Sequence, residues 1–308
     1  MRIPAIVMTV LCLAACGSSG SGPSGSAGGV KIGMSISTLN NPYFVQLRDG
    51  AQSEAIRLGA ALTVTDAQND ASHQVNQVLN FTSQNMKAII INPVDSNAAA
   101  PAVKAADRAR IPVIAADRVV TGAEVAQTVA SDNLSGGRMA AQELAQRIGR
   151  RGIVVVLQGT PGTSATNFRD RGFNEGIAAY PDVKVVARQP ADFDRTKGLD
   201  VMTNLLQSHP DVTGVFAEND EMALGAIKAL GSRAGKQVTV IGFDGTPEGL
   251  KAVQAGTMAA TIAQQPRLLG QQAVDSAIKA ANGETIKKSV AVPVKVADKE
   301  NVTDFLTS

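Results

Sequence analysis

Polar and aromatic side chains recur in this 308-residue chain directly after short runs of apolar residues. Asn41, Tyr43 and Phe44 follow one such run, and the pair Asp117-Arg118 follows another. A carboxylate accepts hydrogen bonds from hydroxyl groups, a guanidinium donates to them, and an aromatic face covers the C–H groups of a ring. These residue types together have the chemistry of sugar recognition.

The same bias continues along the rest of the chain. The further candidates that follow apolar runs are Asn92, Arg169, Phe193, Asn219, Phe243, Asp244 and Gln264. Taken singly, each has an ordinary explanation, because Asn-Pro and Asp-Gly are turn signals and Asp-Arg can be a surface pair. Their repetition at one run after another favours a binding site instead, and two Asp against two Arg suit an uncharged ligand.

Apolar runs alternate with longer amphipathic segments from Val30 onward. The runs are rich in Val and Ile, and several are apolar on both faces, which is typical of parallel strands covered by helices on both sides. The expected strands are 30–36, 61–64, 88–91, 112–115, 126–130, 153–157, 183–187, 212–217, 238–242, 258–263 and 291–296. The expected helices between them are 42–58, 72–84, 97–109, 136–148, 165–179, 196–208, 221–230, 247–255 and 267–281.

These strands are too many for one sheet of usual size. The pattern therefore predicts an α/β protein with two doubly wound, Rossmann-like lobes, and no disordered linker separates them near the middle of the chain. Ligands of open α/β sheets bind beyond the carboxyl ends of the strands. Since the candidate residues follow the strands, we expect them to meet at those ends.

The amino terminus predicts export. Residues 5–13 form an apolar stretch of signal-peptide length, shorter than the roughly 20 residues that a membrane-spanning helix needs. The small residues before Cys16 resemble the lipobox of bacterial lipoproteins, so that 1–15 would be a signal peptide and Cys16 the lipidated residue. The alternative is a plain secretory leader cleaved elsewhere. Residues 16–29, rich in Gly and Ser, are expected to be a flexible tether to the membrane.

The composition argues against several classes of protein. Lys and Arg number 29 against 27 Asp and Glu, so the chain lacks the basic excess of a nucleic-acid-binding protein. Cys12 and Cys16 are the only cysteines, which excludes zinc fingers, a disulfide scaffold and cysteine proteases in the folded body. No metal and no cofactor are expected.

An enzyme on a Rossmann-like fold is a second hypothesis. The chain has neither G-x-G-x-x-G after its first strand nor G-x-x-x-x-G-K-[ST] anywhere. His73 and His209 lie away from the candidate pocket, so a catalytic triad lacks its base. Asp192 and Asp194 could be imagined as the carboxylate pair of a glycoside hydrolase, but Arg195 adjoins them. We therefore expect a protein that is not an enzyme.

Several longer segments carry a family resemblance. They are 37–42 (STLNNP), 91–93 (INP), 129–133 (VASDN), 162–165 (GTSA), 189–195 (QPADFDR), 219–226 (NDEMALGA), 242–247 (GFDGTP) and 260–264 (ATIAQ). They resemble the ribose-binding branch of the type I periplasmic sugar-binding proteins, the receptors of ABC sugar importers. The resemblance runs from about Val30 to near the carboxyl end.

The resemblance implies a monomeric receptor that binds a neutral monosaccharide between two hinged lobes and delivers it to an ABC permease. D-ribose is the first expectation, and allose or another monosaccharide is the second. The sugar contacts that it implies are Asn41, Tyr43, Phe44, Asn92, Asp117, Arg118, Arg169, Phe193, Asn219, Phe243, Asp244 and Gln264. Tyr43 departs from the family pattern, in which this position is Phe, and this leaves the identity of the sugar open.

The resemblance also implies the lobe boundaries. One lobe would comprise 30–131 with 265–292, and the other 132–264 with 293–308, joined by a three-strand hinge. A transcriptional regulator of the LacI type shares this architecture and is the remaining alternative. Such a regulator needs a helix-turn-helix before the core, where residues 1–29 have a leader and a Gly/Ser spacer instead.

Overall fold

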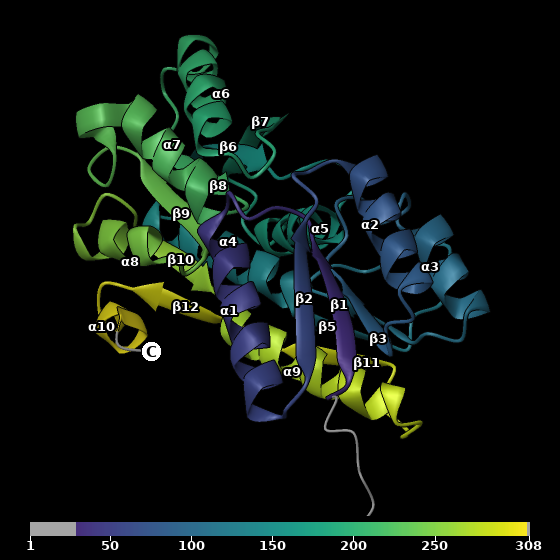
Figure 1. The fold of residues 1–308 in the computed structure, drawn as a ribbon. Coiled ribbons are helices and arrows are strands. Elements are labelled where there is room, and N and C mark those ends of the chain that lie inside the picture. The colour runs from purple at the N-terminus through teal and green to yellow at the C-terminus, as the bar shows by residue number, and fades with distance from the viewer. Residues whose placement is uncertain (1–28, 307–308) are drawn as a thin grey trace, which may run out of the picture.

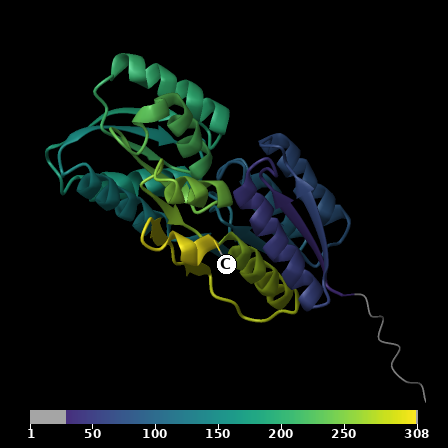
Figure 2. The same cartoon turned by 90° about the vertical axis from the view of Figure 1, so that its left-hand side faces the viewer.

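The computed structural model describes residues 29–306. The predicted signal peptide (1–15), Cys16 and almost all of the predicted tether lie outside the described residues. Within the described part, the chain forms two six-stranded sheets that are flanked by helices (Figure 1). The two α/β lobes lie side by side, and the end of the chain runs past both of them (Figure 2). This confirms the predicted fold class.

The first lobe contains a fully parallel sheet. Its strand order is β11-β5-β4-β3-β1-β2, which is the order expected of a doubly wound sheet with crossover helices. The strands are β1 (Lys31–Ile36), β2 (Ala61–Asp66), β3 (Ala88–Ile91), β4 (Val113–Ala116), β5 (Gln127–Ser131) and β11 (Ser289–Val292). The helices are α1 (Pro42–Arg57), α2 (Ala71–Ser83), α3 (Ala100–Arg108) and α9 (Pro266–Ala281).

The second lobe repeats this arrangement with one antiparallel edge strand, β12. Its strand order is β12-β10-β9-β8-β6-β7. The strands are β6 (Gly152–Gln158), β7 (Val183–Pro190), β8 (Gly214–Ala217), β9 (Thr239–Asp244), β10 (Ala260–Ala263) and β12 (Lys295–Asp298). The helices are α4 (Asn133–Arg147), α5 (Ser164–Ile177), α6 (Arg195–Ser208), α7 (Asp220–Leu230), α8 (Pro247–Gln254) and α10 (Val302–Leu306), with the short 3-10 turn η1 (Gly231–Arg233) after α7.

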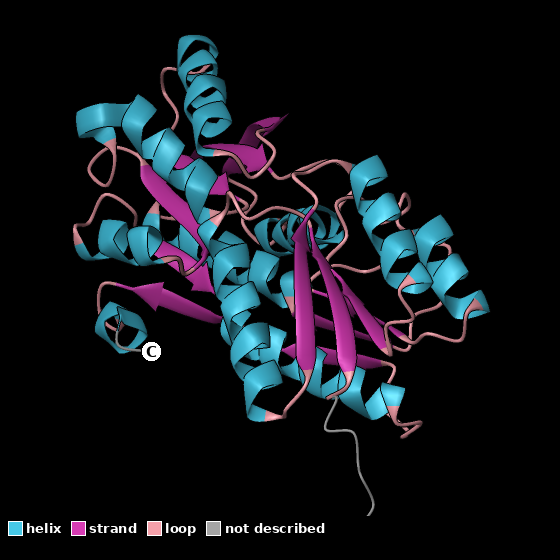
Figure 3. Ribbon diagram, viewed as in Figure 1, coloured by secondary structure: helices cyan, strands magenta, loops and turns pink. Residues whose placement is uncertain are grey.

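Both faces of each sheet are buried, which explains why the strands read as continuous apolar runs. In β3, Ile89 and Ile91 contact the cluster that includes Phe81 of α2, whereas Ile90 belongs to the cluster under α1 and α9. The helices on the two faces of each sheet are visible in Figure 3. Side chains of alternate strand positions therefore build separate cores.

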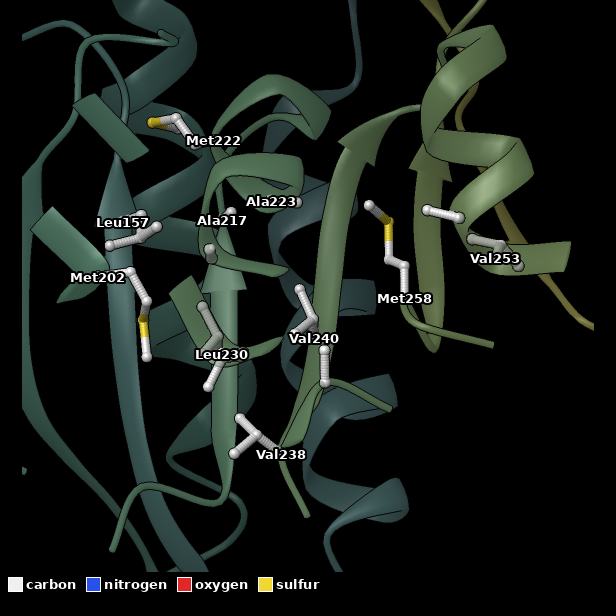
Figure 4. Packing of buried hydrophobic residues seen from close by; sticks show 14 of the residues in the cluster. Leu157, Met202, Ala217, Met222, Ala223, Leu230, Val238, Val240, Val253 and Met258 are labelled. Atoms are coloured by element: carbon white, nitrogen blue, oxygen red, sulfur yellow. The ribbon is translucent and has the colours of Figure 1, made fainter. Parts of the chain in front are cut away.

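The second sheet is packed in the same way. Figure 4 shows one face, where Met202 of α6, Met222 of α7 and Val253 of α8 cover Leu157 and Val240. The opposite face is covered by α4 and α5 and contains the stacked rings of Phe173 and Phe216, whose centroids are 4.6 Å apart. This packing fixes the strands whose carboxyl ends carry the candidate residues.

The prediction of a single strand over 291–296 was wrong. The structure has two strands there, β11 in the first sheet and β12 in the second. Pro293 lies between them and has no N–H to contribute to a ladder, so the strand ends before it. Helix α10 was not predicted. None of the helices in residues 29–306 is long and apolar enough to cross a bilayer.

Candidate ligand-binding site

The carboxyl ends of the strands in both lobes surround one cavity. Its lining comprises Asn41, Tyr43, Phe44, Asp117, Arg118, Ala165, Arg169, Phe193, Asn219 and Asp244. The sequence had singled out all of these as candidates except Ala165. Three further candidates, Asn92, Phe243 and Gln264, are buried next to the cavity and contact residues that line it.

Helix starts position several of these side chains. Asn41 caps α1 by accepting a hydrogen bond from the backbone N–H of Tyr43 over 2.9 Å. Asn219 caps α7 by accepting from the N–H of Met222 over 2.9 Å, and its Nδ2 donates to the carbonyl of Phe193. Since each helix begins where a strand ends, the caps that start the helices also place amide groups at the cavity.

In the first lobe, Asp117 is held from two sides. The Tyr43 hydroxyl lies 2.7 Å from Asp117 Oδ1, and Asn92 Nδ2 lies 3.4 Å from Oδ2. Asn92 also accepts from the N–H of Ser37 and donates to the carbonyl of Ala116, so it joins the ends of β1, β3 and β4. Asn92 therefore acts on the cavity through Asp117 rather than as part of its lining.

The guanidinium of Arg118 lies between two aromatic rings from different lobes. Its central carbon is 5.2 Å from the centre of the Phe44 ring and 5.7 Å from that of Phe193. One terminal nitrogen donates to the carbonyl of Pro93 over 2.8 Å, while the buried Nε has no hydrogen-bond partner among the described residues. Burial lowers the pKa of Arg118, and Asp117 opposes that shift. Nε lies 3.7 Å from Asp117 Oδ2, beyond hydrogen-bond distance, so it is a donor that a ligand oxygen can satisfy.

In the second lobe, Arg169 is almost completely buried and held by several groups. Its Nε donates to Asn133 Oδ1 over 2.8 Å, and a terminal nitrogen donates to the carbonyl of Glu218 over 2.5 Å. The guanidinium also lies 3.6 Å from Asp244 Oδ1 and against the ring of Phe243. These contacts fix the plane of the guanidinium against one wall of the cavity.

Three residues of the cavity lining have a strained backbone. Asp117, Phe193 and Asp244 have φ angles of 69°, 59° and 122°, in the region that side chains rarely occupy. Such conformations cost about 1–3 kcal/mol each and persist where the surrounding structure enforces them. All three residues line the cavity. The strain aims the carboxylates and the ring inward.

The charges of the cavity are balanced. Two carboxylates, Asp117 and Asp244, face two guanidiniums, Arg118 and Arg169. Burial raises the pKa of Asp244 well above its usual value, against the opposing effect of Arg169. Burial also raises the pKa of Tyr43, with Asp117 adding to the shift, so the phenol keeps its proton at neutral pH. Such a site suits a neutral ligand with many hydroxyl groups.

Direct hydrogen bonds join the two lobes beside the cavity. Ser164 of the second lobe donates its N–H to Ser96 Oγ over 3.1 Å and accepts at its own Oγ from the N–H of Val119 over 2.9 Å. The N–H of Ser96 donates to the carbonyl of Gly162. The two lobes are therefore in contact beside the cavity, in a closed arrangement.

A second, larger cavity shares Asn41, Phe44, Arg118 and Phe193 with the first. Arg118 and the rings of Phe44 and Phe193 therefore separate the first, inner cavity from the second, outer one. Asp192 and Asp194, which were considered as the carboxylate pair of a glycoside hydrolase, line the outer cavity. Asp194 caps α6 and Asp192 pairs with Lys197 Nζ over 2.7 Å, so both have ordinary structural partners.

Sequence reasoning missed Asn133, Glu218 and Ala165. Asn133 lies two residues after the end of β5, and this position after a strand was the available signal. Ala165 has no chemistry that a sequence reveals. His73 and His209 line neither cavity. Within residues 29–306, no three His, Cys, Asp or Glu side chains are grouped so that they could hold a metal ion.

The chain is similar to known proteins along most of its length. Residues 32–285 match the family model described as "Periplasmic binding protein domain". The chain is 49% identical over 269 residues to the Ribose import binding protein RbsB of Salmonella typhimurium, covering 87% of this chain and 90% of that protein.

Solved structures are similar over the whole fold. An ABC transporter solute binding protein from Bacillus halodurans with bound myo-inositol is 34% identical, with a TM-score of 0.87 over 92% of this chain and 99% of that one. A periplasmic solute binding protein from Actinobacillus succinogenes with bound D-allose is 35% identical, with a TM-score of 0.84 over 89% and 99%. By sequence and by fold, the chain belongs to the periplasmic binding protein domain family of ABC transporter solute-binding proteins.

Proposed function

We propose that this protein is the extracytoplasmic binding component of an ABC sugar importer and that its ligand is a neutral monosaccharide, D-ribose in the first place. The observation that carries the proposal is the buried, charge-balanced cavity in which Asp117, Arg118, Arg169 and Asp244 converge with three aromatic residues. The 49% identity to a ribose import binding protein supports the choice of ribose.

The chemistry of the cavity matches a sugar well. A sugar hydroxyl can donate to a carboxylate and accept from a guanidinium at the same time, so each buried polar group finds a partner. The rings of Phe44 and Phe193 can cover the C–H faces of the sugar ring. D-allose, the ligand in one structural relative, is the alternative monosaccharide.

We infer that binding closes the two lobes around the sugar. The proposed lobes are 30–131 with 265–292 and 132–264 with 293–308. The change of sheet between β5 and β6, between β10 and β11, and between β11 and β12 supports a hinge of three crossings. Since each lobe supplies only part of the lining, ligand affinity is greatest in the closed form, and ligand shifts the balance toward it.

The proposal includes an anchor and a partner. The predicted signal peptide and the predicted acylation of Cys16 would hold the protein, as a monomer, at the outer side of the membrane. The closed rims of the lobes would then be recognised by the permease. Labelling of cells with a fatty-acid analogue tests the anchor, because Cys16→Ser should lose the label and appear in the soluble fraction.

A thermal-shift panel tests the proposed ligand class. A ligand present at 100 times its dissociation constant stabilises the folded state by about 2.7 kcal/mol, which raises the melting temperature clearly. We expect D-ribose to give a large shift, and ribose 5-phosphate and free amino acids to give none. A melting curve that stays unchanged with ribose and allose but moves with one of the charged compounds would contradict the proposal.

A further inference from the structure

The Tyr43 hydroxyl sits at a junction between the two lobes. Tyr43 is 3% exposed and lies in the first turn of α1. Its oxygen is 2.7 Å from Asp117 Oδ1 and 3.1 Å from Gln264 Oε1. Gln264 in turn donates through Nε2 to Asp244 Oδ1 over 2.7 Å. The chain Asp117–Tyr43–Gln264–Asp244 thus connects the carboxylates of both lobes.

This chain engages acceptor oxygens of Asp117, Gln264 and Asp244 beside the cavity. A phenol has one proton, yet two acceptors lie within reach of the Tyr43 hydroxyl. Asp117 Oδ2 is already met by Asn92 Nδ2 and by Arg118, and the side-chain oxygen of Asn219 caps α7. Of the four carboxylate oxygens of Asp117 and Asp244, only Asp244 Oδ2 has no hydrogen bond within the described part of the chain. Each of these acceptor oxygens except Asp244 Oδ2 therefore already has a protein donor near it.

We propose that the Tyr43 hydroxyl is a specificity-determining group that selects an aldopentose over the hexose of the same ring configuration. By donating its one proton to Asp117 Oδ1 and placing its oxygen 3.1 Å from Gln264 Oε1, it obstructs the approach of an additional hydroxyl to these two acceptors. A hydroxyl buried without a partner costs affinity. The phenol oxygen also takes space next to the cavity. This inference rests on the proposed function, since it assumes a monosaccharide in this site.

D-ribose and D-allose are the matched pair of ligands for a test. In their pyranose forms they share the configuration of the ring hydroxyls, and allose adds one hydroxymethyl group. Tyr43→Phe keeps the ring that packs in the first core and removes only the hydroxyl. Tyr180→Phe is the control, because Tyr180 is the other tyrosine of the chain and lines neither cavity.

Calorimetric titration of the three proteins with both sugars measures the ratio of the allose dissociation constant to the ribose dissociation constant. We expect Tyr43→Phe to lower this ratio about tenfold, because Asp117 Oδ1 and Gln264 Oε1 become available to the extra hydroxyl. We expect Tyr180→Phe to keep the wild-type ratio.

Three results would overturn the inference. In the first, Tyr43→Phe leaves both constants unchanged, and in the second it changes both by the same factor, which indicates a structural role only. In the third, Tyr180→Phe shifts the ratio as much as Tyr43→Phe does. Wild-type protein that binds neither sugar would overturn the proposed function and, with it, this inference.

Discussion

The guanidinium carbon of Arg169 lies 3.8 Å from the centre of the Phe243 ring, which forms a cation–π contact in a fully buried setting. Such contacts contribute up to about 2 kcal/mol when they are shielded from water. Together with the bond from Nε to Asn133, the ring fixes the orientation of Arg169. Phe243 therefore serves the site without lining it, and Arg169 needs little reordering to bind a ligand.

Arg169→Ala should weaken ribose binding strongly. The change removes a charged donor and leaves the buried carboxylate of Asp244 without its positively charged partner. We expect a loss of about 2–4 kcal/mol in binding free energy, or roughly 30- to 1,000-fold in the dissociation constant measured by calorimetry. The control is Arg171→Ala on the same helix, where the side chain is 55% exposed and its removal should leave affinity unchanged. Wild-type affinity in Arg169→Ala would remove Arg169 from the site.

Gly162→Ala should hinder closure of the lobes. A Cβ at Gly162 would lie 2.1 Å from Asp95 Oδ2 of the other lobe. The Asp95 carboxylate is held in place because Oδ1 accepts from the N–H groups of Asn97 and Ala98. We therefore expect weaker sugar binding, by about tenfold, measured by calorimetry.

The matched control is Gly149→Ala. Gly162 and Gly149 have φ angles of 86° and 72°, so alanine is strained at both, but a Cβ at Gly149 meets no atom within 4 Å. Both variants should lose some stability for this reason. Only Gly162→Ala should lose affinity. Equal affinity in the two variants would show that the contact with Asp95 does not limit closure.

Glu218 should make the stability of the protein depend on pH. Burial raises the pKa of Glu218 to about 8, although its Oε2 accepts from the N–H of Gly159. The carboxyl has its ordinary pKa of 4.5 when it is exposed in the unfolded chain. Between these two values, the folded state binds a proton that the unfolded state releases. The stability that Glu218 contributes is thus complete below the lower pKa and declines as the pH rises toward the higher one.

Glu218→Gln keeps the shape of the side chain and removes this titration. Urea unfolding at about pH 5 and about pH 8 should show that the variant gains stability relative to the wild type at the higher pH. Glu175→Gln serves as the control, because Glu175 is 43% exposed. If the free energy of unfolding changes with pH in the same way in the wild type and in Glu218→Gln, the pH dependence does not come from Glu218.

The sequence could predict the fold because each strand and helix carries a local signal. Apolar runs with two buried faces, such as Ala88–Ile91, were found within one or two residues. The break between β11 and β12 was missed because 291–296 was taken as one strand, although Pro293 interrupts its apolar residues. Which sheet each half joins depends on contacts with β5 and β10, which lie far away in the sequence.

The candidate site was predictable in its residue types, since polar residues after strands must meet at the carboxyl edge of a sheet. The sequence could not predict which of these residues line the cavity and which only hold the lining residues in place. Asn133 holds Arg169 because α4 and α5 lie next to each other in the second lobe, and Gln264 links Tyr43 to Asp244 because it lies where the chain crosses between the lobes. Such pairings between distant segments have no local signature, and so Asn133 and Glu218 were not among the candidates.

Small-angle X-ray scattering of the wild-type protein with and without saturating D-ribose tests the central claim most directly. If ribose binds between the lobes and stabilises the closed arrangement, the radius of gyration should be smaller with ribose than without it. Ribose 5-phosphate at the same concentration should leave the radius unchanged. A radius that does not respond to ribose, or that decreases equally with both compounds, would contradict a receptor that closes around a neutral monosaccharide.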